Sequence, residues 1–196
     1  MNVKKDFLNG KKSALAKFQL AKKENKVDLG IQSILDIINE SENYYTSSSC
    51  FGRIVLLEIP NIGDKKEAKF LGKWHRTIKV NELFSAVKNA KKGQLWLLSQ
   101  SPIIHIVVKT NNAADKLLKT AIACSFKNSN LKSLSKKIVV EVCSTERLDA
   151  PVGKDGVLFC NKDHLELLVD ISNEIIKKST LKLKKLEEKL RKDLST

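Results

Sequence analysis

The sequence of 196 residues lacks the long apolar runs that would indicate a membrane protein or a secreted one. No run approaches the roughly 18 residues that a membrane-spanning helix needs. The N-terminus, MNVKKDFLNGKK, has neither the apolar stretch nor the small-residue cleavage site of a secretory signal. We therefore expect a protein that stays in the cytoplasm and has no membrane segment.

Two kinds of binding motif are also missing. The four cysteines are dispersed without a C-x-x-C pair, so no zinc site or other metal centre is expected. The eight glycines never form G-x-G-x-x-G after a strand, which argues against a Rossmann-like nucleotide pocket. A nucleotide-like cofactor would therefore need another kind of pocket.

Lysine dominates the positive charge, since four of the 36 basic residues are arginine. With 22 acidic residues the formal net charge is +14. Such an excess favours a polyanionic partner, nucleic acid first, because clustered cations release condensed counterions from phosphates. A lysine-rich surface of the thermophile type is the alternative. The arginine that closes the run YYTSSSCFGR, residues 44–53, is therefore unusual in this chain.

The hydrophobic pattern predicts an α+β fold that is not Rossmann-like. Helical spacing indicates helices near residues 1–26, 29–39, 81–90 and 112–124, and from residue 163. Branched apolar segments indicate strands near residues 53–59, 69–80, 95–100, 103–110, 137–144 and 157–160. We expect one domain, residues 1–178, in which N-terminal and C-terminal helices pack on a mixed sheet of about six strands. A Lys-rich helical extension, residues 179–196, would follow it.

Five segments occur in a recognisable order: TSSSCFGRI, GKWHR, SPIIHI, AIACSFKNS and STERLDAPVG. Together they resemble the wybutosine-synthesising methyltransferase family, over nearly the whole chain from Phe7 to about Ile176. The resemblance implies an S-adenosylmethionine-dependent enzyme without a Rossmann-like fold. Its substrate would be phenylalanine tRNA, in which it would methylate a ring nitrogen (N4) of the tricyclic wyosine-type base next to the anticodon.

The chain departs from the family's motifs at three notable positions. The central serine of the first motif is Phe51, which removes one hydroxyl group. The two glycines that the family carries around its Phe-Lys/Arg segment are Ser125 and Asn130. A side chain at either position makes a close approach of the backbone to a ligand harder.

The same segments supply the candidate cofactor-binding residues, which are Ser48, Ser49, Gly52, Arg53, Lys127 and Ser129. Hydroxyls and backbone N–H groups around Gly52 can bind a carboxylate or a phosphate, and Arg53 offers two parallel N–H donors. The alternative is an ordinary hydrogen-bonded loop in which Arg53 forms a salt bridge.

Candidate substrate-binding residues are Tyr44, Tyr45, Lys73, Trp74, His75 and Arg147. Aromatic rings beside cations suit a base that is turned out of an RNA loop, although core packing of the same rings is equally reasonable. No catalytic residue is identified, but His105 and Asp28 are candidate proton acceptors. A satisfied core histidine and a helix N-cap are the alternative roles of these two residues.

Two other classes of function stay open at this point. The chain could be a non-catalytic RNA-binding protein, or an assembly protein whose basic C-terminal helix recruits an acidic partner. Saturable binding of S-adenosylmethionine separates the enzyme from both. The sequence leaves the oligomeric state open between monomer and dimer.

Overall fold

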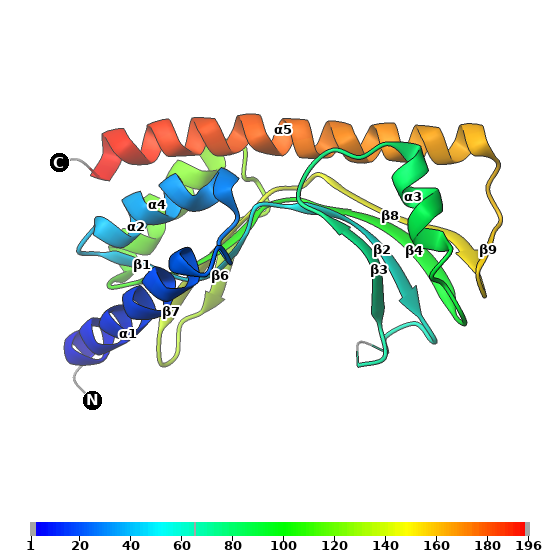
Figure 1. The fold of residues 1–196 in the computed structure, drawn as a ribbon. Coiled ribbons are helices and arrows are strands. Elements are labelled where there is room, and N and C mark those ends of the chain that lie inside the picture. The colour runs from blue at the N-terminus through cyan, green and yellow to red at the C-terminus, as the bar shows by residue number, and fades with distance from the viewer. Residues whose placement is uncertain (1–2, 65, 195–196) are drawn as a thin grey trace. The chain divides into compact units, whose positions relative to one another are not determined.

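Apolar side chains at alternate strand positions and at helical spacing in the helices form two main hydrophobic cores. The computed structural model describes residues 3–64 and 66–194. These residues divide into two compact units, each with its own sheet (Figure 1). The first unit comprises residues up to 51, residues 102–145 and those from 180 onwards, and the second comprises residues 52–101 and 146–179.

The first unit is built on a four-stranded antiparallel sheet. Its strand order is β1 (Tyr44–Cys50), β5 (Ile103–Val108), β7 (Ile138–Cys143) and β6 (Asn130–Ser133). Its helices are α1 (Val3–Lys23), the 3₁₀ helix η1 (Leu29–Ile31), α2 (Gln32–Glu40), α4 (Asn111–Ala123) and the last part of α5 (Lys162–Leu194).

The two faces of this sheet are covered differently. On one face, strand residues such as Ile104, Ile106 and Val140 belong to a large core that also contains residues of α2, α4 and α5. On the other face, α1 contributes Phe7 to a small cluster with Tyr45 and Val107. Because this second cluster is small, part of that face remains available for a pocket beside α1.

The second unit is built on a five-stranded antiparallel sheet. Its strand order is β3 (Lys69–Trp74), β2 (Arg53–Ile59), β4 (Gln94–Gln100), β8 (Arg147–Lys154) and β9 (Val157–Leu158). The helix α3 (Val80–Val87) and the first part of α5 lie on one face of this sheet (Figure 1).

The structure confirms the α+β class but corrects the single mixed sheet of about six strands. The strands form two sheets, and every pairing is antiparallel. Residues 44–50 form a strand although four of the seven are serine or threonine, because Tyr44 anchors its first half in the large core and Tyr45 in the small cluster with Phe7. The strands β1, β6 and β8 were not expected, whereas β9 falls within the expected strand segment 157–160.

The helix α5 continues without a break through residue 178, where the predicted domain would end. Leu183, Leu186 and Leu190 recur at helical spacing and are at most 2% exposed in the core of the first unit. The segment after residue 179 therefore packs as part of a long helix. The division into a domain and a C-terminal extension stays a prediction. Within residues 3–64 and 66–194, none of the helices combines the length and apolar character that crossing a lipid bilayer requires.

Candidate functional site

The serine-rich strand β1 carries three consecutive exposed hydroxyl side chains, Ser47, Ser48 and Ser49. Thr46, just before them, is buried and held by Asn39 of α2. The Thr46 backbone N–H donates to Asn39 Oδ1 at 2.8 Å, and Asn39 Nδ2 donates to Thr46 Oγ1 at 3.0 Å. This buried amide contact fixes the strand at the point where its buried half ends and its exposed half begins.

A bulge follows directly. Thr46 pairs with Ile106 and Ser48 pairs with His105, so Ser47 is an extra residue on β1. In a regular strand Ser48 would point to the same face as Thr46, towards the large core. The bulge instead turns Ser48 to the face that carries His105.

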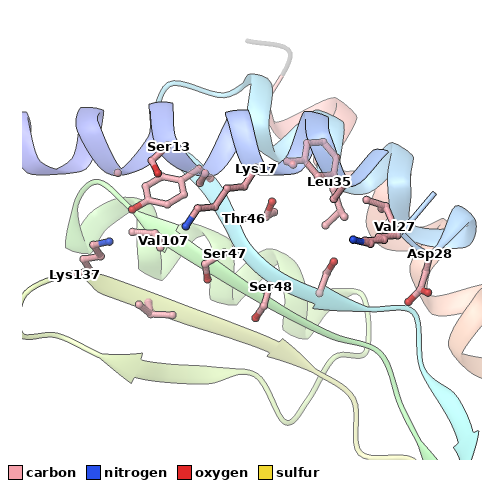
Figure 2. A pocket seen from close by; sticks show the side chains of 18 residues that line it. Ser13, Lys17, Val27, Asp28, Leu35, Thr46, Ser47, Ser48, Val107 and Lys137 are labelled. Atoms are coloured by element: carbon pink, nitrogen blue, oxygen red, sulfur yellow. The ribbon is translucent and has the colours of Figure 1, made fainter. Parts of the chain in front are cut away.

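A pocket of about 530 Å³ lies between α1 and this face of the first sheet (Figure 2). Its polar lining includes Ser13, Lys17, Lys26, Asp28, Tyr45, Thr46, Lys137 and the three serines of β1. Figure 2 shows the amines of Lys17 and Lys137 directed into the space between the helix and the strands. The pocket therefore combines cations, hydroxyls and one carboxylate.

One donor of this pocket has no hydrogen-bond partner among the residues that the structure describes. The Tyr45 hydroxyl belongs to a residue that is 2% exposed, and no described residue forms a hydrogen bond with it. A Cβ on Gly10 of α1 would lie 2.5 Å from this oxygen and 3.7 Å from Lys137 Nζ, so the missing side chain leaves room there. An unsatisfied buried hydroxyl costs about 1–3 kcal/mol, and an acceptor on a ligand would remove that cost.

A row of polar side chains crosses the same face. Ser48, His105, Glu141 and Asn130 are direct cross-strand partners on β1, β5, β7 and β6. Ser48 Oγ lies 2.8 Å from His105 Nδ1, and His105 Nε2 lies 2.6 Å from Glu141 Oε2. These three groups form a continuous hydrogen-bonded chain from a hydroxyl to a carboxylate.

The carboxylate at the end of this chain is kept ionised by its neighbours. Burial raises the pKa of Glu141, but hydrogen bonds from His105, Lys132 and Asn130 outweigh burial and hold the pKa below its usual value. Lys132 Nζ lies 3.1 Å and Asn130 Nδ2 lies 3.3 Å from Glu141 Oε1. With Glu141 ionised, a neutral His105 donates from Nε2, which leaves Nδ1 as the acceptor for the Ser48 hydroxyl. The imidazole is thus oriented to receive a proton on the side of Ser48.

Several predicted residues have other roles in the structure. Asp28 precedes η1 at the N-cap position, but its side chain makes no capping hydrogen bond. Its Oδ2 accepts from the Phe51 backbone N–H at 2.9 Å, and the residue lines the pocket. The side chain of Asp28 therefore holds the backbone at Phe51 and does not cap a helix.

The segment after α4 is a tight turn rather than an open loop. Ser129 Oγ donates to the Phe126 carbonyl at 2.7 Å and accepts from the Cys143 backbone N–H at 3.2 Å, while Lys127 is exposed. Ser125 has φ of +70°, a left-handed conformation that suits the glycine of the family motif. In this structure the Ser129 hydroxyl stabilises the turn.

The two tyrosines do not offer rings to a base. Tyr44 is 3% exposed in the large core, and its hydroxyl donates to the Ala113 carbonyl at 3.0 Å. Tyr45 is 2% exposed and packs on Phe7, with ring centroids 5.2 Å apart. Their predicted role in stacking on a nucleotide is therefore corrected to core packing, and the hydroxyl of Tyr45 alone reaches the pocket.

The remaining candidates lie in the second unit. Arg53 Nε donates to Gln100 Oε1 at 2.7 Å, and its guanidinium lies 5.6 Å from the centre of the Phe70 ring. Gly52, just before it, is buried with φ of +101°. Arg147 pairs with Asp149 at the start of β8.

The three candidates at the end of β3 differ in exposure. Lys73 is exposed, whereas Trp74 and His75 are half-buried. The indole of Trp74 packs against the core of the second unit.

Sequence reasoning missed Glu141, Lys132, Lys17 and Lys137. Glu141 could have been found, because it is a lone carboxylate in the apolar segment KIVVEVC, just as His105 is a lone histidine in SPIIHI. The two pocket lysines give no such signal, since lysine is abundant throughout this chain.

Comparisons with known proteins agree in sequence and in fold. A family model described as methyltransferase TYW3 matches residues 9–192. The tRNA(Phe) 7-((3-amino-3-carboxypropyl)-4-demethylwyosine(37)-N(4))-methyltransferase 1 of Pyrococcus horikoshii is 44% identical, with 97% of each chain covered. A protein of the same name, without the number, from Thermococcus sibiricus is 44% identical, with 96% of each covered. The solved structure of PH1069 protein from Pyrococcus horikoshii has a TM-score of 0.92 at 44% identity, covering 97% of this chain and 98% of that one.

The lowered pKa of Glu141 predicts how stability depends on pH. A carboxyl whose pKa is lower in the folded state stabilises the fold above its ordinary pKa, and this contribution is lost as the pH falls through the lowered value. We expect Glu141→Gln to lower the melting temperature at neutral pH and to matter little well below about pH 4. Thermal unfolding followed by circular dichroism across this range measures the difference.

The matched control is Glu188→Gln, which changes an exposed glutamate of α5 in the same unit. It should leave the melting temperature nearly unchanged at every pH. A Glu141→Gln effect of equal size at neutral and acid pH would contradict the electrostatic account.

Proposed function

The chain belongs to the methyltransferase TYW3 family, and we propose that it methylates N4 of the wyosine-type base beside the anticodon of phenylalanine tRNA. The observation that carries the proposal is the chain of hydrogen bonds from Ser48 through His105 to Glu141, on the same sheet face as a pocket of about 530 Å³. A protein that merely binds RNA has no need of such an arrangement. The net charge of +14 supports a tRNA substrate.

S-adenosylmethionine is the methyl donor in this proposal, because it supplies a methyl group on a positively charged sulfur. The pocket beside α1 lies within the range of about 300–1,000 Å³ that is usual for small-molecule sites. Lys17, Lys137 and the unpartnered Tyr45 hydroxyl are donors suited to the carboxylate of such a ligand. Asp28 is an acceptor suited to hydroxyl groups, and Figure 2 places it on the opposite side of the pocket from Lys137.

The serines Ser48 and Ser49 line this pocket, which supports the proposal that they lie at the donor. Gly52, Arg53, Lys127 and Ser129 stay predictions for the donor site. The cytoplasmic location predicted from the N-terminal sequence is part of the same proposal.

His105 is the proton acceptor that we propose. Methylation forms a bond between N4 and the methyl carbon and breaks the bond between that carbon and sulfur, and the proton on N4 must leave. The Ser48 oxygen receives this proton while its own proton passes to His105 Nδ1. The ionised Glu141 stabilises the imidazolium that results.

The direct test of the function is transfer of a labelled methyl group from S-adenosylmethionine to phenylalanine tRNA. The tRNA should carry the 4-demethyl tricyclic base, and unmodified tRNA is the control. Label in the precursor alone is the expected result. Tight binding of the same tRNA without transfer, under conditions that saturate both ligands, would instead favour a non-catalytic RNA-binding protein.

The donor pocket is tested by substitutions that remove one amine and keep its aliphatic chain. Lys17→Met and Lys137→Met should each weaken S-adenosylmethionine binding by roughly 10- to 100-fold, as expected for loss of a charge-assisted hydrogen bond. Isothermal titration calorimetry without tRNA gives the dissociation constants. Lys12→Met is the control, since Lys12 is an exposed residue of α1 that does not line the pocket. Unchanged affinity in both pocket variants would rule out this donor site.

The proton acceptor is tested by His105→Ala, which should lower kcat by about 10²–10⁴-fold and change KM little. His164→Ala, which changes an exposed histidine of α5, is the control for general effects of losing a histidine. A His105→Ala enzyme with a normal kcat would assign this residue a structural role.

A further inference from the structure

The five-stranded sheet of the second unit has one face packed against helices and one face that is not. On β2, Ile54 and Leu56 point into the core with α3 and α5. Arg53, Val55 and Leu57 alternate with them and point to the other face. Within the described part of this unit, no helix lies on that second face (Figure 1). We call it the open face.

Aromatic side chains form a row across the open face. Leu57 pairs with Phe70 of the edge strand β3 on one side and with Trp96 of β4 on the other. Trp96 in turn pairs with Pro151 of β8. Phe70 is 57% exposed, although it pairs with Leu57 within the sheet. A large exposed ring on a rigid strand costs little ordering entropy when it meets a flat ligand.

Cations surround this row. The cross-strand pairings place one acidic residue, Asp149, and four basic residues on the open face. The basic residues are Arg53, Lys73, Arg147 and Lys154. Arg53 is held in place by Gln100 Oε1 at 2.7 Å, and its guanidinium covers the Phe70 ring at 5.6 Å. The pair presents an aromatic ring and a planar cation together.

The aromatic residue that the sequence singled out on β3 lies on the opposite face. Trp74 pairs with Ile54 and packs against the core of this unit. Its ring lies over Gly72, where a Cβ would come within 2.0 Å of it. Phe70, whose motif context gave no signal, is the ring that β3 presents outward.

We propose that the open face binds unpaired nucleotides of the anticodon loop, with bases stacking on Phe70 and Trp96 and phosphates contacting Arg53, Lys73 and Arg147. This inference rests on the proposed function for the identity of the RNA. Unpaired nucleotides fit better than a duplex, because a duplex keeps its base faces stacked and offers them to no side chain. The excess of cations fits phosphates. The rings fit bases of any sequence, since every base has a flat face.

The experiment uses the full chain with Trp74→Phe, which leaves Trp96 as the single tryptophan of the two in the sequence. Its fluorescence is titrated with an unmodified anticodon stem-loop of phenylalanine tRNA and with a blunt-ended, fully paired RNA duplex of the same number of nucleotides. The stem-loop should quench Trp96 and bind more tightly than the duplex. In this background, Phe70→Ala should weaken stem-loop binding roughly tenfold or more, as expected for one lost stacked base.

Two further variants test whether the effect depends on an aromatic ring at position 70. Phe159→Ala removes a phenylalanine that is 73% exposed and lies outside the sheet strands, and it should leave the affinity unchanged. Phe70→Leu keeps an apolar side chain without a ring and should lose most of what Phe70→Ala loses. Equal losses in Phe70→Ala and Phe159→Ala would overturn the proposal, as would wild-type affinity in Phe70→Leu.

The outcomes separate this inference from the proposed function. In one outcome the unsubstituted protein transfers the methyl group, but Trp96 is not quenched and Phe70→Ala binds the stem-loop normally. This outcome overturns RNA binding by the open face and leaves the proposed enzyme activity intact. In the opposite outcome the stem-loop quenches Trp96 and Phe70→Ala binds it more weakly, but no methyl group is transferred to the 4-demethyl tRNA. This outcome supports RNA binding by the open face and contradicts the catalytic proposal. Equal affinity for the fully paired duplex overturns the preference for unpaired nucleotides.

Discussion

The register of three antiparallel strands is the constraint on which the candidate site depends. Side chains alternate between the two faces of a sheet, so a shift of one residue moves every group to the wrong side. The bulge at Ser47 makes that shift once, between the buried Thr46 and the exposed Ser48. The contact of Thr46 with Asn39 pins the strand just before the bulge. Without this local irregularity Ser48 would point into the large core and could not meet His105.

The same register explains how a buried carboxylate is tolerated. Glu141 faces His105 across one strand boundary and Asn130 across the other, and Lys132 lies beside them. Removing a carboxylate from water is costly unless charged and polar groups replace the lost hydration. Here the partners more than offset burial, since they hold the pKa of the carboxyl below its ordinary value. The electrostatic state of Glu141 then decides the tautomer of His105, and thereby which nitrogen can take up a proton.

The two units carry different parts of the proposed activity. The first unit contains the pocket and the hydrogen-bonded chain, and its donors come from α1, β1 and the start of the strand that contains Glu141. The second unit contains the open face with its aromatic row. In both units one face of the sheet packs into the main hydrophobic core, and the other face carries the groups of the proposed activity. Rigid strands suit this work because their cross-strand hydrogen bonds hold side chains at fixed spacing.

The sequence by itself determined the α+β class, most of the helices and longer strands, and the resemblance to a methyltransferase family, because these depend on local periodicity and on ordered motifs. It also proposed Ser48 and Ser49 from the family motif, His105 from its place among apolar strand residues, and Asp28 from its place before a helix. The tertiary structure alone decided that Tyr45 is a core residue whose hydroxyl reaches the pocket. It alone joined Glu141 to His105 and turned Phe70 outward in place of Trp74. These choices depend on which strands pair and where one residue bulges, and such long-range contacts leave no trace in local composition.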